Sequence, residues 1–138
     1  MLIDGGEQFK EMLKVFAKRG TLFHCTKRLF LNTILKEGLK PSKPKGITNA
    51  LDGVYLSVVP FDWMDYVTEQ GKYAGLMIEV NVEGFDLYFD HGILELETWE
   101  KHPAFVYKGT ILKERFVKVS ISTEKKPNCF DDITEKVI

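Results

Sequence analysis

The amino-acid sequence predicts a single α+β domain rather than a parallel sheet built from βαβ units. Helical spacing of apolar residues dominates the first part of the chain, and short strand-like segments dominate the rest. The length of 138 residues is that of one domain, and 44% hydrophobic with 28% charged residues is ordinary globular composition. We therefore expect one domain over residues 1–138, beginning with a helix within 1–20 and ending in a polar tail at 123–138.

The first elements predicted are two helices that flank a short strand. Residues 7–19 place four apolar side chains at i, i+3, i+4 and i+7: Phe9, Met12, Leu13 and Phe16. Residues 21–25 read as a short strand. A second helix is predicted over 27–37, with Thr26 as its N-cap and Gly38 as the residue that ends it. The buried face of this helix would carry Phe30, Leu31, Ile34 and Leu35.

A loop, a strand and a short helix follow. Residues 40–52 hold two prolines, a glycine and three lysines, which indicates a loop longer than a plain connection needs. Residues 53–59 are rich in β-branched and aromatic residues and are predicted to be a strand. Residues 61–70 suit a short helix, with three side chains facing inward: Trp63, Tyr66 and Val67.

The second half of the chain is predicted to be mostly strands. These strands are expected at 75–82, 85–89, 104–108 and 116–122, whereas residues 92–101 suit either a helix or an irregular segment. The first strand would bury Leu76, Ile78, Val80 and Val82. The last would bury Val117, Val119 and Ile121. The tail would be tethered by Phe130, Ile133 and Val137.

Charge and cysteine usage limit the class of protein. The formal net charge is −1 and the pI about 6.3, so nucleic acid could be bound only by a local basic patch. Cys25 and Cys129 are far apart and suggest free thiols in a reducing compartment. The first residues contain no apolar signal-peptide core, and no run approaches the roughly 20 apolar residues that cross a bilayer. We expect a cytoplasmic protein without a membrane partner.

The first candidate site is the strand around His24. Alternate residues of a strand share a face. One face would carry Leu22, His24 and Thr26, and the other Phe23 and Cys25. A histidine near a strand end can reach a ligand, and the helix start that follows would suit phosphate. The alternative is a hydrogen-bonded core histidine with Thr26 acting only as a cap.

The second candidate site is the strand around Tyr55. Tyr55 and Ser57 share one face of this strand, so the aromatic ring could stack on a flat ligand ring while the hydroxyl bonds a substituent. The alternative is an ordinary core tyrosine. Together the two motifs predict a pocket shared by the strand of His24 and the strand of Tyr55.

These motifs stand in a recognisable order. The phrases LFHCT, LNTILKEGLKPS and GVYLS are followed by VNVEGFDL with Asp90 and by VYKGTI at 106–111, within residues 21–122. This order resembles the ADP-ribosyltransferase superfamily, especially its small bacterial and phage members, which are related to DNA-ADP-ribosylating toxins and RNA 2′-phosphotransferases. The resemblance implies a split, mostly antiparallel β-sheet with flanking helices and a cleft that binds NAD.

The resemblance also implies roles for individual residues. NAD would be the substrate, and no metal would be needed. His24 would hydrogen-bond the ribose hydroxyls, and the backbone around Cys25, where the family often has glycine, would hold the nicotinamide carboxamide. Thr26 would contact the adenosine side. Tyr55 would stack on the nicotinamide ring, and Ser57 would support that wall.

The catalytic carboxylate does not stand at the family position. A glutamate would be expected near Pro103, Ala104 and Phe105, none of which is acidic. Glu100 lies nearest, and Glu97 forms an E-x-E pair with Glu95 slightly upstream. The catalytic candidates are therefore Tyr55, Glu100 and Glu97. The alternative is that all three glutamates are surface acids.

Further residues are weaker candidates. Three lysines of the 40–52 loop could approach a pyrophosphate or could be ordinary solvated side chains: Lys40, Lys43 and Lys45. His91 and His102 form no zinc pattern with the cysteines. The leading function is NAD-dependent transfer of ADP-ribose to a macromolecule, protein or nucleic acid, as in toxin-like or phage-conflict proteins. The alternatives are an inactive module that binds NAD, ADP-ribose or another nucleotide, and a protein-interaction domain on the same fold.

Overall fold

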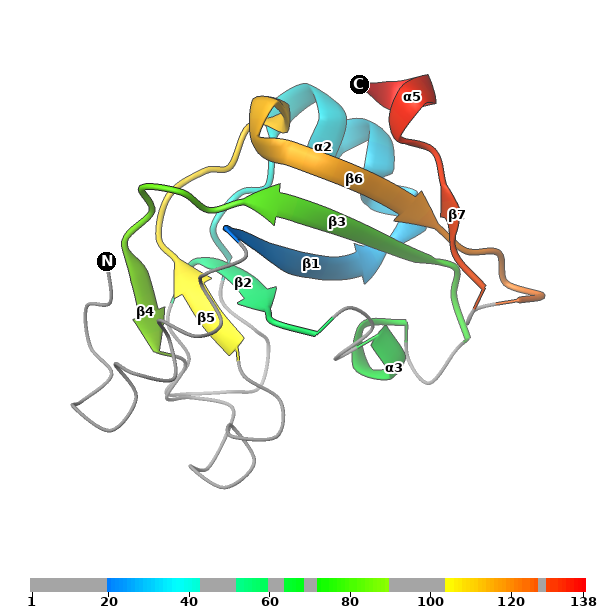
Figure 1. Ribbon diagram of the computed structural model, residues 1–138. Helices are drawn as coiled ribbons and strands as arrows, with labels where there is room; N and C mark the ends of the chain where they lie inside the picture. The colour runs from blue at the N-terminus through cyan, green and yellow to red at the C-terminus, as the bar shows by residue number, and fades with distance from the viewer. Residues whose placement is uncertain (1–19, 43–51, 60–63, 69–71, 90–103, 127–128) are drawn as a thin grey trace.

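A computed structural model describes residues 20–42, 52–59, 64–68, 72–89, 104–126 and 129–138 of the chain (Figure 1). The helix predicted at 7–19, the ambiguous segment at 92–101 and most of the predicted loop at 40–52 lie outside the described residues.

The described residues form one seven-stranded sheet in the order β4-β5-β2-β1-β3-β6-β7 (Figure 1). Its strands are β1 (Thr21–Lys27), β2 (Val54–Ser57), β3 (Gly75–Asn81), β4 (Leu87–Phe89), β5 (Ala104–Tyr107), β6 (Phe116–Ile121) and β7 (Asp131–Asp132). All neighbouring strands in this order pair antiparallel. The expected α+β class is confirmed, and each strand predicted at 21–25, 53–59, 75–82, 85–89, 104–108 and 116–122 is present.

Among the described residues, a large hydrophobic cluster and a small one lie on opposite faces of the sheet. One face, here called the α2 face, packs on helix α2 (Leu31–Glu37) and holds the main core. The strand residues of that core include Leu22, Val54, Leu56, Leu76, Ile78, Val80, Leu87, Phe105 and Val119. The opposite face, here called the α3 face, packs on helix α3 (Met64–Val67), where a small cluster joins Met64 to Phe23 and Met77.

The connection from β1 to α2 differs from the prediction. β1 continues through Thr26 to Lys27, and a 3₁₀ turn, η1 (Arg28–Phe30), precedes α2. Thr26 is therefore a strand residue and not the predicted N-cap, since the residue before the turn is Lys27 and no side chain caps it. Phe30 is 43% exposed and does not belong to the buried face, which is centred on Ile34.

Gly38 ends α2 as predicted. Its φ is +83°, a conformation that glycine adopts at far lower cost than other residues. A β-carbon at this position would lie only 2.7 Å from the carbonyl oxygen of Ile111. This close approach belongs to the bridge between Leu39 and Ile111, which fixes the end of α2 against the chain before η2 (Lys113–Arg115).

A bulge corrects the predicted face of β6. Val119 opposes Ile78, but the register then shifts, so that Phe116 opposes Val80. Val117, predicted to be buried, is 49% exposed, whereas Phe116 is only 6% exposed. An extra residue in one strand moves the following side chain to the other face, and strict alternation cannot reveal it.

The C-terminal segment is part of the fold. β7 extends the sheet beyond β6, and the short helix α5 (Thr134–Val137) follows it (Figure 1). As predicted, the tethering residues pack on the cores: Phe130 on the small cluster, and Ile133 and Val137 on the main core. Within the described part of the chain, no helix has the length and apolarity needed to cross a membrane.

Candidate functional site

The strand that carries His24 is bordered by β3 on one edge and by β2 on the other. β1 and β3 pair along seven residues, from Thr21 opposite Asn81 to Lys27 opposite Gly75. On the other edge, the register of β1 and β2 contains one pair, Phe23 opposite Ser57. This edge, here called the seam, brings together the two strands that the sequence predicted to share a site.

The imidazole of His24 bridges the seam. Its Nδ1 lies 2.8 Å from the backbone oxygen of Tyr55. Because a carbonyl oxygen can only accept a hydrogen bond, Nδ1 carries the proton and donates it. In the neutral ring Nε2 is then an acceptor. The side chain thus makes a cross-strand bond beside the single backbone pair of the seam.

The environment of His24 favours the neutral form of its ring. Burial lowers the pKa of the imidazole below its ordinary value of 6.5, and the hydrogen bond to the Tyr55 carbonyl partly offsets this effect. A half-buried neutral imidazole with Nε2 as an acceptor is suited to a ligand hydroxyl. The tautomer of His24 depends on the hydrogen bond across the seam, so it could not be predicted from the sequence.

The strand pairing contradicts the predicted common groove for the side chains of His24 and Tyr55. Alternation places His24 on the α2 face together with Leu22 and Thr26, as predicted from the sequence. Phe23 pairs with Ser57, so Ser57 and Tyr55 belong to the α3 face. The imidazole and the phenol therefore leave the sheet on opposite faces. What the structure brings together is the imidazole and the backbone of Tyr55.

Ser57 supports the seam from within. Its side chain is only 3% exposed, and its hydroxyl lies 3.4 Å from the carbonyl oxygen of Phe23 and 3.2 Å from that of Val59. Cys25 is not in a disulfide, is half-buried and packs against the small cluster of the α3 face. Thr26 is also half-buried and follows His24 on the α2 face.

Several predicted site residues fall outside the described residues. These are Glu95, Glu97, Glu100, Lys43 and Lys45. The position of a catalytic carboxylate therefore stays a prediction.

Lys40 is described. It is exposed, and its Nζ pairs with Glu37 at 2.7 Å. Across the described part of the chain, no three histidine, cysteine or acidic side chains gather as metal ligands would.

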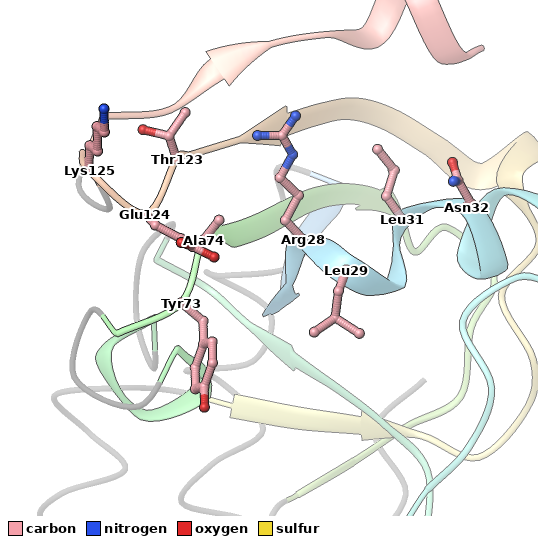
Figure 2. Close-up of a pocket in the computed structure, with 9 residues that line it drawn as sticks. All are labelled: Arg28, Leu29, Leu31, Asn32, Tyr73, Ala74, Thr123, Glu124 and Lys125. Carbon is pink, nitrogen blue, oxygen red and sulfur yellow. The ribbon is translucent and has the colours of Figure 1, made fainter.

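Sequence reasoning missed an open pocket on the far side of β1 from the seam. Its volume is about 660 Å³, and its walls come from η1 and α2, the chain before β3 and the chain after β6 (Figure 2). Arg28 lies near the helix start that the sequence predicted to suit phosphate. The backbone N–H of Arg28 already donates to Ala74 at 3.0 Å.

Fold and site together define an α+β domain with an antiparallel sheet whose seam is bridged by a histidine side chain. Comparison with known proteins adds nothing to this definition. No protein-family model, curated protein or solved structure matches the chain.

Proposed function

We propose that the chain binds NAD at the seam between β1 and β2 and transfers ADP-ribose to a macromolecule, in the manner of the superfamily that its motifs resemble. The hydrogen bond between His24 Nδ1 and the Tyr55 carbonyl carries this proposal. It supports the ribose-binding role, because it fixes the tautomer in which Nε2 accepts a hydrogen bond from a hydroxyl group.

The opposite orientation of the two side chains changes the proposed binding mode. A single groove on one face could not contact both the imidazole and the phenol. We propose instead that the dinucleotide passes beside the single β1–β2 pair of Phe23 and Ser57, with a ribose at His24 and the nicotinamide on the α3 face beside Tyr55. The backbone around Cys25, the residue that follows His24 in β1, would hold the carboxamide.

Transfer of ADP-ribose breaks the bond between the ribose and nicotinamide, and positive charge develops on the sugar. A carboxylate placed beside that charge would lower the barrier. Glu97 and Glu100 are the proposed carboxylates, with Tyr55 holding the leaving group. If neither glutamate reaches the seam, the site would bind the dinucleotide without turnover. This second candidate function is favoured by the lack of an acidic residue at Ala104 and Phe105, where β5 begins.

The first test is ligand binding by thermal shift with NAD, ADP-ribose and nicotinamide. A ligand that binds only the folded state raises the free energy of unfolding by RT ln(1 + [L]/Kd). His24→Asn is the decisive variant, because its amide can keep a donor toward the Tyr55 carbonyl while it lacks the Nε2 acceptor. We expect it to fold like the wild type and to bind NAD at least about tenfold more weakly, a loss of about 1.4 kcal/mol.

The aromatic contact has its own matched pair of variants. Tyr55→Phe keeps a ring that can stack, and Tyr55→Ala removes it. We expect the first to bind nicotinamide and NAD nearly as the wild type does, and the second to lose most of the thermal shift. Wild-type binding by both His24→Asn and Tyr55→Ala would refute the proposed site, as would the absence of any shift with all three ligands.

Mass spectrometry then separates an enzyme from a binding module. Release of nicotinamide together with a mass increase on the chain or on an added protein or nucleic acid would establish transfer. Glu97→Gln and Glu100→Gln, made singly, identify the carboxylate. Unchanged turnover in both would remove these two residues from the mechanism, and a thermal shift without nicotinamide release would assign the binding module.

A further inference from the structure

The pocket of about 660 Å³ lies beside β3 and β6, whereas the seam lies on the β2 edge of β1. Its volume is within the range of roughly 300–1,000 Å³ that is typical of ligand sites. Three chain segments supply the walls, which consist of Arg28, Leu29, Leu31, Asn32, Tyr73, Ala74, Thr123, Glu124 and Lys125. None of these residues belongs to the proposed NAD site.

Hydrogen bonds between the three segments fix the shape of the pocket. The backbone N–H of Arg28 donates to Ala74 at 3.0 Å, and its Nη1 lies 3.4 Å from the carbonyl oxygen of Ser122. Gly75 donates its N–H to the Ser122 hydroxyl at 2.7 Å, and Ser122 N–H donates to the Gly75 carbonyl at 3.0 Å. The walls are therefore held in place without a ligand, which reduces the entropy cost of binding.

The pocket has a basic side and an apolar side. Figure 2 shows the side chains of Arg28 and Lys125, with Leu31 beside Arg28, on one side and those of Leu29 and Tyr73 on the other. Leu29 is 68% exposed, so its side chain is accessible to a ligand. The only carboxylate among the described lining residues is that of Glu124.

Two further cations lie over the Tyr73 ring. Lys27 Nζ is 4.4 Å and Lys72 Nζ 5.9 Å from the ring centroid. Two basic residues line the pocket, Arg28 and Lys125, against one described carboxylate, Glu124, and the two lysines add positive charge beside the lining residue Tyr73. Such an excess of positive charge favours an anionic ligand, although the whole chain has a net charge of −1.

We propose that this pocket binds a short stretch of single-stranded nucleic acid. Phosphates would contact Arg28 and Lys125, and a base would rest on Leu29 and the edge of the Tyr73 ring. Cations beside an aromatic and apolar surface are the combination by which proteins hold unpaired strands. A duplex buries the faces of its bases, so it could use only the cations and not the apolar side.

This proposal goes beyond NAD binding and does not depend on it. If NAD also binds at the seam, the pocket would hold the acceptor strand. Arg28 is four residues beyond His24, about 13 Å along an extended chain, so both ligands could be present together. Binding of the strand is measured without NAD, and its failure would therefore leave the proposed NAD site untouched.

The test is fluorescence anisotropy with a short labelled DNA or RNA strand that forms no secondary structure, titrated at several salt concentrations. The variant Arg28→Gln/Lys125→Gln removes two pocket cations. The matched control Lys113→Gln/Lys136→Gln removes two exposed cations elsewhere and changes the net charge equally. We expect the pocket variant to bind at least about fivefold more weakly, with the slope of log K against log salt shallower by about 0.7 for each lost phosphate contact.

Leu29→Ser tests the apolar side without risk to folding, because the leucine is mostly exposed. We expect it to weaken binding at least about threefold while the salt slope stays unchanged. Equal weakening by the pocket and control variants would overturn the proposal. So would equal affinity for the matched duplex, preference for an acidic peptide, or no binding at low salt.

Discussion

The two edges of β1 are held to the sheet in different ways. On the β3 edge, seven residue pairs form a regular ladder, and Thr21 adds a side-chain hydrogen bond of 2.8 Å to Glu79. On the β2 edge, the register contains the pair of Phe23 and Ser57, and the His24 imidazole bonds the Tyr55 carbonyl. On the edge with little backbone pairing, the side chains of His24 and Ser57 bond backbone carbonyl oxygens of the neighbouring strand. A polar side chain placed there is also within reach of a ligand.

The largest expected effect lies on the ladder side of β1, where β3 pairs in turn with β6. Phe116→Ala empties a position that is 6% exposed opposite Val80, and we expect a loss of about 3–5 kcal/mol in the free energy of unfolding. Val117→Ala is the matched control next to it, at 49% exposure, and should change stability by less than about 0.5 kcal/mol. Urea denaturation measures both, and a larger loss in the Val117 variant would contradict the observed bulge.

A smaller effect is expected at the seam. His24→Phe removes the donor to the Tyr55 carbonyl, and we expect the free energy of unfolding to fall by about 1–3 kcal/mol. His24→Asn can retain a donor and should lose less. If the two variants were equally stable in urea denaturation, the hydrogen bond across the seam would not contribute measurably to the fold.

The smallest effect is the dependence of stability on pH. The folded state lowers the pKa of His24, so below pH 6.5 the unfolded chain binds a proton more readily than the folded chain. Stability should therefore fall as the pH drops from 7 toward 5, by at most about 1.4 kcal/mol per pH unit for this one residue.

His24→Asn is the control for this measurement, because it removes the titrating ring and leaves His91 and His102 in place. The difference in unfolding free energy between wild type and variant should shrink as the pH falls. A difference that does not change with pH would mean that the imidazole titrates alike in the folded and unfolded chains.

Strand positions and face assignments were largely predictable because they follow from alternation. Leu76, Ile78 and Val80 are fully buried as the pattern predicted, and Tyr55 and Ser57 share a face. The predictions failed where the backbone departs from regular geometry. The bulge in β6 exchanged the roles of Phe116 and Val117, and the 3₁₀ turn after β1 exposed Phe30 and left Thr26 in the strand.

The candidate sites were predictable only in part. His24 and Tyr55 were correctly placed on two strands, and these strands are neighbours in the sheet. Their opposite faces depend on the register between β1 and β2, and a shift of one residue in that register would have given the opposite result. The pocket around Arg28 and Tyr73 combines segments that are far apart in the chain, and no local pattern connects them.

The amino-acid sequence by itself determined which segments become strands, which side chains of each strand share a face, and that helix α2 ends at Gly38. These properties depend on the period of apolar residues and on the backbone freedom of single residues, both of which are local. Only the tertiary structure decided which strands pair, which face each candidate side chain joins, and which nitrogen of His24 carries the proton. Those outcomes depend on contacts between residues distant in the chain. The geometry of strand pairing sets them, and composition does not.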